Sequence, residues 1–187
     1  MKKHIVTALL YTAITAMVLG LGYPLAITAL AHVALPAKAN GQLLYNDKGE
    51  IIGSALIGQP FMGEKYFHSR PSAAGTGYDA SSSSGSNLGP TSKVLSDRVQ
   101  QSIAAEKQAQ VPIDLATTSA SGLDPDITPA AALFQVSRVA NARGMSEEQL
   151  RSLVMSRVSP RQFAVLGEPR INVLLLNEEL DGNVKTR

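Results

Sequence analysis

Hydrophobic residues are distributed very unevenly along this chain. From Ile5 to Ala37 there is no Lys, Arg, Asp or Glu, and most positions are apolar. A helix needs about 20 such residues to cross the hydrocarbon core of a bilayer, so the run predicts a transmembrane helix over 5–34. A cleaved signal sequence ending near Ala39 is the alternative, but its apolar region would span only about 7–15 residues.

Beyond the apolar run, strand patterns and helix patterns follow one another without strict alternation. Short strands are predicted at 42–45, 51–58 and 111–118, and the sequence Asn46-Asp47-Lys48-Gly49 is typical of the turn in a hairpin. Helix signals are the Thr128-Pro129 start, the glycine at 144 and a Ser146/Gln149 capping box. The predicted helices are 92–108, 129–143 and 146–157. The apolar run 171–176 is expected to begin as a strand and to continue into a terminal helix that ends near 181.

These elements predict an α+β fold of three parts. Residues 1–4 form a cytoplasmic tail, residues 5–34 the transmembrane helix, and residues 35–187 an extracytoplasmic α+β domain. Lys2 and Lys3 favour the cytoplasmic side for the N-terminus under the positive-inside rule. They belong to the 17 basic residues, so the rest of the chain holds 15 basic against 15 acidic residues. This balance gives no indication of a nucleic-acid partner.

The transmembrane helix has two features that suggest a neighbouring helix. Thr12, Ala16 and Gly20 recur at a four-residue interval and place small side chains on one face, which lets another helix approach closely. Pro24 interrupts the backbone hydrogen bonding, and lipid cannot replace the missing bond. A lone anchor that carries small residues by chance is the other interpretation.

A low-complexity stretch from Ser69 to Pro90 allows two interpretations. A Gly/Ser-rich loop before a helix can bind phosphate, but the sequence Gly85-Ser86-Asn87-Leu88-Gly89-Pro90-Thr91-Ser92 lacks the lysine of a P-loop. Pro90 also removes a backbone donor. Lys93 could reach an anion at the helix N-terminus. The alternative is a capped surface loop, for which Ser86 and Asn87 are candidate contacts to a partner or ligand.

Two charged positions are further candidates for contact with a partner or ligand. Arg70 can clamp a carboxylate or phosphate, or it can brace its own loop. Asp124, with Asp126, can bind a divalent cation, or it can hydrogen-bond its own backbone in a turn.

The sequence contains few of the residues and motifs that enzymes use for catalysis. There is no cysteine, and His68 is the only histidine outside the membrane segment and its flank. The sequence around Ser119 and Ser121 does not match a G-x-S-x-G nucleophile motif. We therefore expect no catalytic residues, no metal site and no tightly bound cofactor.

Several long segments of this chain resemble the KdpC family, the accessory subunits of the bacterial Kdp potassium-transporting P-type ATPase. The resemblance spans most of the chain in the family's order. Its segments are the membrane helix with Gly22-Tyr23-Pro24, GSALIGQPF (53–61), YFHSRPSAAGTGYDASSSSGSNLGPTS (66–92), TTSASGLDPDITPAAALFQVSRVANARG (117–144) and GEPRINVLLLN (167–177).

The resemblance implies a specific role. It implies a non-enzymatic, single-pass subunit in the bacterial inner membrane, with a potassium-channel-like subunit and an ATP-hydrolysing subunit as partners besides the lipid bilayer. It also implies a catalytic chaperone that stabilises assembly and raises the ATP affinity of the hydrolysing subunit, so that ATP belongs to the complex. The alternative is a membrane-tethered periplasmic module that binds a solute or gates the transporter entrance.

Overall fold

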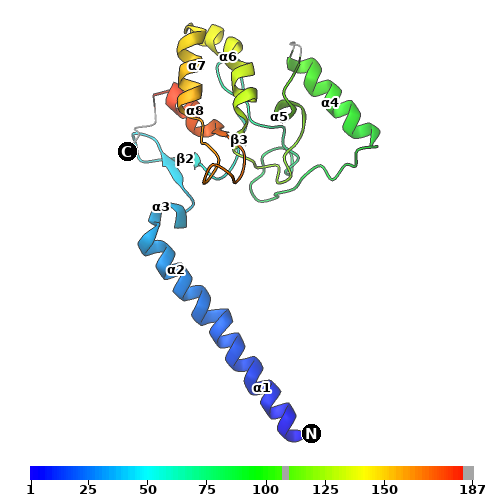
Figure 1. Ribbon diagram of the computed structural model, residues 1–187, viewed down its shortest axis with the longest axis vertical. Helices are drawn as coiled ribbons and strands as arrows, with labels where there is room; N and C mark the ends of the chain where they lie inside the picture. The colour runs from blue at the N-terminus through cyan, green and yellow to red at the C-terminus, as the bar shows by residue number, and fades with distance from the viewer. Residues whose placement is uncertain (107–109, 183–187) are drawn as a thin grey trace. The chain divides into compact units, whose positions relative to one another are not determined.

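The computed structural model describes residues 1–106 and 110–182 and separates into two compact units, residues 1–43 and the chain from residue 44 onward (Figure 1). The first unit is a long apolar helix and the second mixes helices with short strands. The predicted α+β class with one N-terminal membrane helix is therefore confirmed.

The first unit is helical almost throughout. Helix α1 (Lys2–Met17) continues through a π-helical turn, η1 (Val18–Gly22), into α2 (Tyr23–Ala34), and a short helix α3 (Pro36–Ala39) follows. The run Lys2–Ala34 has 33 residues and is long and apolar enough to cross a membrane. None of the residues of these helices is buried.

The π-helical turn lies immediately before the proline. The backbone N–H of Tyr23 donates to the carbonyl of Val18, five residues back, as a π-helix requires. Pro24 then occupies the first turn of α2, where a missing N–H is best tolerated. The irregularity that the sequence predicted around Gly20–Pro24 is thus a change of hydrogen-bond register within a continuous helix.

The predicted hairpin comes next along the chain, and its first residue, Leu43, is the last residue of the first unit. Strand β1 (Leu43–Tyr45) pairs with β2 (Ile51–Ser54). In the turn, Asn46 Oδ1 accepts the backbone N–H groups of Lys48 and Glu50, and Gly49 adopts a positive φ of 79°. The prediction of a strand as far as residue 58 was too long, because the Ile57 N–H turns back to the carbonyl of Ser54.

The core lies around helices α6 (Pro129–Arg143), α7 (Glu147–Ser156) and α8 (Val173–Leu180). A two-residue strand β3 (Asp126–Ile127) pairs antiparallel with β4 (Ile171–Asn172), directly before α8. The buried apolar side chains come from all of these elements and include Ile127, Ala132, Val136, Val139, Leu150, Val154, Ile171, Val173 and Leu176.

The predicted helix ends agree with the structure. Thr128 Oγ1 accepts the N–H of Ala131 at 3.2 Å, and Ser146 Oγ accepts that of Gln149 at 3.2 Å. Gly144 ends α6 in the left-handed conformation, at a φ of 65°. These are the caps that the sequence indicated.

The predicted strand at 111–118 was wrong. Residues Ile113–Ala116 form a short helix, α5, which begins after Pro112. The alternation of Val111, Ile113 and Leu115 imitates a strand, yet proline cannot donate to a sheet. Tertiary contacts decide the outcome, because Leu115 is buried and the Asp114 carboxylate accepts the N–H of Thr128 at 2.8 Å.

Helix α4 (Lys93–Glu106) is confirmed, although its predicted end at 108 lies outside the described residues. Ser92 Oγ accepts the N–H of Leu95 at its start. The helix lies to one side of α6–α8, with α5 between them (Figure 1). No described residue of α4 is buried, so its apolar face is only partly covered.

Two buried side-chain amides hold the irregular segment that follows the hairpin. Asn177, on α8, accepts the N–H of Phe67 and donates to its carbonyl, both at 2.9 Å. Gln135, on α6, accepts the N–H of His68 at 2.8 Å and donates to its carbonyl at 3.1 Å. Each amide pairs with the backbone as a neighbouring strand would, and Phe67 is thereby fixed in the core.

Arg143 connects the ends of the same elements. Its guanidinium donates to the carbonyls of Lys65 and Leu180, at 2.6 and 2.9 Å, and pairs with Asp181 at 2.8 Å. It also lies 5.1 Å from the ring centroid of Tyr66, whose hydroxyl donates to Asp181. The C-terminal ends of α6 and α8 and the segment at 65–66 therefore share one cation.

The amide of Asn177 gives a test of this arrangement. Replacement by leucine keeps the volume similar but leaves the N–H and carbonyl of Phe67 without partners. Each buried unpaired group costs about 1–3 kcal/mol, so we expect Asn177→Leu to lower the free energy of unfolding by about 2–5 kcal/mol. Asn141→Leu, at an exposed position of α6, should change it by no more than about 0.5 kcal/mol.

The measurement is denaturant unfolding of the full chain in detergent micelles, followed by the signal of the folded domain. Equal midpoints for Asn177→Leu and Asn141→Leu would show that the amide of Asn177 does not hold the segment.

Candidate functional site

The serine-rich stretch, residues 69–90, forms an ordered loop that is hydrogen-bonded to a second loop, residues 117–124. We call this pair the laced loops. Ser72 Oγ donates to the carbonyl of Gly122 at 2.6 Å and accepts the N–H groups of Ala74 and Tyr78. Further along, Ser83 Oγ donates to the Ser121 carbonyl at 3.0 Å. The hydroxyls therefore bind carbonyl groups of the 117–124 loop, which is a structural use of serine.

Tyr78 forms hydrogen bonds within the first of these loops. Burial raises the pKa of Tyr78 to about 12, so its hydroxyl stays protonated and donates to the carbonyl of Arg70. Ser84 Oγ donates to the Ala73 carbonyl at 2.9 Å. The segment from Arg70 to Ser84 thus has its own hydrogen bonds as well as those to the 117–124 loop.

Glycines allow the two loops to approach closely. A Cβ on Gly122 would lie 2.6 Å from the Ser84 carbonyl oxygen, and the φ of Gly122 is 68°. A Cβ on Gly85 would lie 2.7 Å from the Ala120 carbonyl oxygen. Backbone meets backbone at both positions, so a larger residue forces the loops apart.

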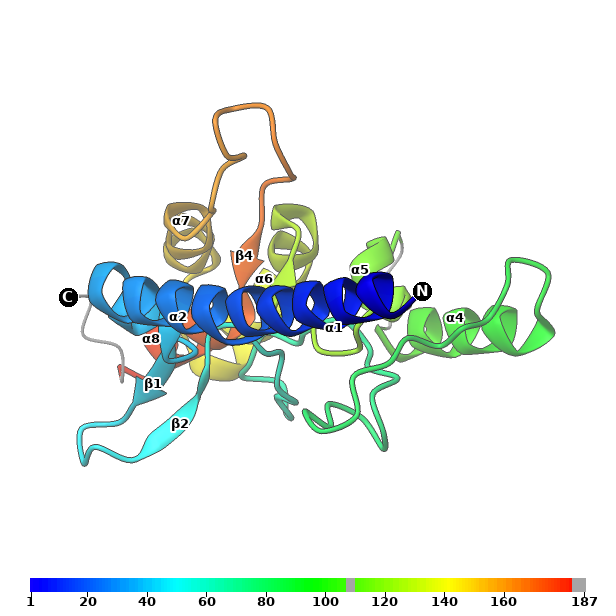
Figure 2. The same ribbon diagram turned by 90° about the horizontal axis from the view of Figure 1, so that it is seen from below.

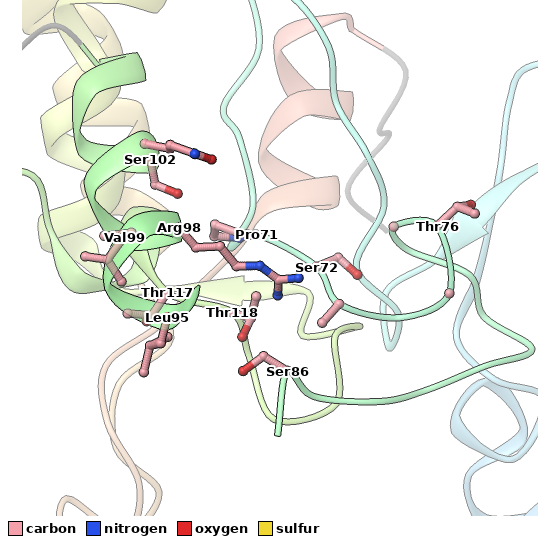
Figure 3. Close-up of a pocket in the computed structure, with 15 residues that line it drawn as sticks. Pro71, Ser72, Thr76, Ser86, Leu95, Arg98, Val99, Ser102, Thr117 and Thr118 are labelled. Carbon is pink, nitrogen blue, oxygen red and sulfur yellow. The ribbon is translucent and has the colours of Figure 1, made fainter. Parts of the chain in front are cut away.

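A cavity of about 340 Å³ lies between these loops and α4. Figure 3 shows part of its wall, with Leu95 and Val99 from α4, and Ser86, Thr117 and Thr118 from the other segments. Its volume falls within the range of small-molecule sites. The cavity combines apolar side chains with hydroxyl groups.

Arg98 is the only charged residue that lines this cavity among the residues the structure describes. Its side chain reaches from α4 toward Thr118, Ser86 and Ser72 (Figure 3). The sequence analysis missed Arg98, although its position three residues after Leu95 places it on the same face of α4. The other residues that line the cavity supply hydroxyl, amide, backbone and apolar groups.

A second hollow, of about 200 Å³, lies beside the first loop and contains charges of both signs. Arg70 lines it and pairs with Asp124 at 3.7 Å. The same guanidinium also donates to Thr117 Oγ1 and the Thr118 carbonyl, at 3.4 and 3.3 Å. The structure therefore brings the predicted residues Arg70 and Asp124 together, and Arg70 braces its own loops.

Asp126 contributes a half-buried carboxylate to this hollow. Burial raises its pKa, and the charge of Asp124 adds to the rise, whereas Arg170 at 3.0 Å opposes it. Asp124 Oδ1 also accepts the N–H of Asp126 at 3.0 Å, as expected of an aspartate in a turn. Within residues 1–106 and 110–182, no group of three or more His, Cys, Asp and Glu side chains could hold a metal ion.

The other predicted site residues lie apart from one another. Lys93 pairs with Asp97 at 3.0 Å on the exposed surface of α4. Asn87 is exposed, with a φ of 53°. On the membrane helix, Thr12, Ala16, Gly20 and Pro24 are all exposed, and a Cβ on Gly20 would meet nothing within 4 Å.

His68 does not form a catalytic arrangement with the serines. Its ring Nε2 lies 3.0 Å from the Gly63 carbonyl. Burial lowers the pKa of His68, and the positive charge of Arg138 lowers it further. The ring is therefore neutral near pH 7, and its Nε2 contacts a backbone carbonyl.

Comparison with known proteins matches both units at once. The model of the KdpC family, described as "K+-transporting ATPase, c chain", matches residues 5–182. A "Potassium-transporting ATPase KdpC subunit" from Koribacter versatilis is 58% identical, covering 97% of this chain and 96% of that protein. Proteins of the same name from Acidobacterium capsulatum and from Rhodopseudomonas palustris (strain BisB18) are 56% and 53% identical, covering 96% and 97% of this chain and 98% of each relative.

The two glycines at 85 and 89 give a matched test of the laced loops. We expect Gly85→Ala to expose the 72–86 segment, because the new methyl group collides with the Ala120 carbonyl. Gly89→Ala should leave it unchanged, since nothing lies within 4 Å of a Cβ there. Limited proteolysis or hydrogen exchange over 72–86 measures the difference, and equal protection in both variants would contradict the close approach.

Proposed function

The chain belongs to the KdpC family, and from that premise we propose that it is a non-catalytic subunit of an ATP-driven potassium uptake complex. In this proposal it stabilises the assembly of the complex and acts as a catalytic chaperone, raising the ATP affinity of the ATP-hydrolysing subunit. The observation that carries the proposal is a family match over residues 5–182, which includes both the membrane helix and the domain.

The membrane helix supports a role in assembly. Thr12, Ala16 and Gly20 form an exposed strip along it, and a Cβ on Gly20 would meet no atom of the described residues within 4 Å. The π-helical turn at Val18–Gly22 includes Gly20 of this strip, and such turns are frequent at functional positions. We propose that a helix of the potassium-channel-like subunit or of the ATP-hydrolysing subunit packs there.

An effect on ATP affinity is proposed to be indirect. Two observations support this proposal: Arg98 is the one charged residue among the described residues that line the cavity, and Lys93 pairs with Asp97. Lys2 and Lys3 favour a cytoplasmic N-terminus in the inner membrane, which puts the domain on the side away from cytoplasmic ATP. Contacts with the other subunits would then favour the nucleotide-binding conformation of the hydrolysing subunit.

The cavity of about 340 Å³ favours a second candidate, a tethered periplasmic module that binds a solute or gates the transporter entrance. The two candidates differ in what the chain does alone. Saturable binding of potassium ions or of a small solute by the full chain in micelles supports the module, whereas an assembly subunit needs no such ligand.

The helix strip gives a direct test of assembly. In membranes that express the whole complex through a C-terminal tag on this chain, we expect Gly20→Leu to reduce co-purification of the two large subunits severalfold. The leucine side chain occupies the space that a neighbouring helix needs. Ile14→Phe also enlarges a side chain, but it lies between Thr12 and Ala16 in sequence and so on the opposite face, and it should have little effect.

Equal recovery of the partner subunits with Gly20→Leu and Ile14→Phe would remove the strip from the assembly interface. Absence of the partner subunits from the wild-type sample would contradict the proposed function itself.

The orientation has its own test, because the chain contains no cysteine. We expect a cysteine at the exposed position of Ser82, Ser82→Cys, to react with a membrane-impermeant maleimide in intact cells whose outer barrier is permeabilised. A cysteine in the N-terminal tail, His4→Cys, should react only after lysis. The opposite pattern would place the domain in the cytoplasm.

A further inference from the structure

The segment between α7 and β4 presents an apolar tip that nothing in the proposed function uses. Residues 157–170 form an irregular hairpin that extends beyond the helices (Figure 2). At its tip Phe163 is 88% exposed, Val165 73% and Leu166 58%. An exposed group of large apolar side chains marks an interaction surface more often than single scattered ones do.

The backbone holds this tip in a defined and costly conformation. The N–H of Val165 donates to the Gln162 carbonyl at 3.1 Å, and Gln162 and Leu166 exchange both of their backbone hydrogen bonds at 2.9 Å. Phe163 and Ala164 both have positive φ values, 52° and 62°. Such turns normally carry Asn or Gly at these positions, because the left-handed conformation brings the Cβ of other residues too close to the following carbonyl oxygen.

The base of the hairpin is fixed to the folded domain. Ser159 and Arg170 exchange two backbone hydrogen bonds, at 2.8 and 3.1 Å. Arg170 also pairs with Asp126 of β3, and β4 follows directly. The tip is therefore a preorganised projection of the core, which lowers the entropy cost of binding.

The charges around the tip indicate what it binds. No charged residue lies between Gln162 and Gly167. The arginines of the two arms are already paired, Arg161 with Glu168 at 2.7 Å and Arg157 with Glu179. An anchor for anionic lipid would present free basic residues with its apolar ones, so the neutral tip complements an uncharged, apolar surface on a protein.

We propose that residues 162–166 form a docking knob, with Phe163 as its anchor, which inserts into an uncharged apolar socket on another subunit of the same ATPase. The proposal rests on the proposed function, since that function supplies the partner. Aromatic side chains that fill a pocket at the centre of an interface commonly carry most of its binding energy. Val165 and Leu166 exclude water around the anchor.

The first test removes the anchor in the intact complex. We expect Phe163→Ser to weaken the association of this chain with the partner subunits roughly tenfold to thirtyfold, as for a typical hot spot. Phe163→Leu should retain most of the affinity. Met155→Ser, on α7, removes a side chain that is also apolar and 52% exposed but lies outside the hairpin, and it should have no effect.

Because Phe163 is almost fully exposed, the unfolding midpoint of the chain alone should be the same for Phe163→Ser and the wild type. An unchanged midpoint with weakened association supports the knob. Association unaffected by Phe163→Ser, or weakened equally by Met155→Ser, would overturn it.

A photo-crosslinking amino acid at position 163 identifies the occupant. An adduct with another subunit of the ATPase supports the proposal. An adduct with lipid, an adduct with a second copy of this chain, or no adduct in the assembled complex overturns it. If the wild-type chain co-purifies with its partners while the knob fails these tests, only the knob is refuted and the proposed function stands.

Discussion

The domain depends on the pairing of two buried side-chain amides with the backbone of one irregular segment. Between the end of β2 and the start of α4 the chain has no helix or strand, yet it includes Phe67, which is fully buried in the core. Asn177 and Gln135 satisfy the backbone of Phe67 and His68 from α8 and α6. Without these amides, burial of Phe67 would leave polar groups unpaired in an apolar surrounding, which is unfavourable.

The same segment continues into the laced loops, so the amides also position the candidate site. Two residues after His68 the chain reaches Arg70, which contacts Thr117, Thr118 and Asp124. Serine hydroxyls then bind the facing loop, and α4 closes the cavity. One continuous segment of the chain thus connects the core, the loops and the cavity, although almost none of this segment is regular secondary structure.

Local signals in the sequence predicted the parts of the fold that are determined locally. Thr128, Gly144 and Ser146 mark helix ends because their side chains or backbone conformations act within one turn. The segment 111–118 failed because its alternation was overridden by contacts of Asp114 and Leu115 with distant residues. A polar residue such as Gln135 on an otherwise apolar helix face is a signal that could have indicated a buried amide, but its partner cannot be read from spacing.

In the candidate site, too, the sequence indicated residue types but not the contacts that depend on the tertiary structure. Arg70 and Asp124 were identified as residue types suited to contact, and the structure pairs them with each other. Arg98 and the tip at Phe163 were missed, since exposure and direction depend on how α4 and the 157–170 hairpin leave the core. The membrane helix and the 157–170 hairpin are the surfaces that we propose for contact with partner subunits.

Hydrogen exchange of the chain in micelles and in the assembled ATPase tests this account most directly. The account predicts that backbone amides of residues 162–166 gain protection on assembly, while those of Phe67 and His68 are equally protected in both states because Asn177 and Gln135 already hold them. Unchanged exchange at 162–166, or amides of Phe67 and His68 that become protected only on assembly, would contradict it.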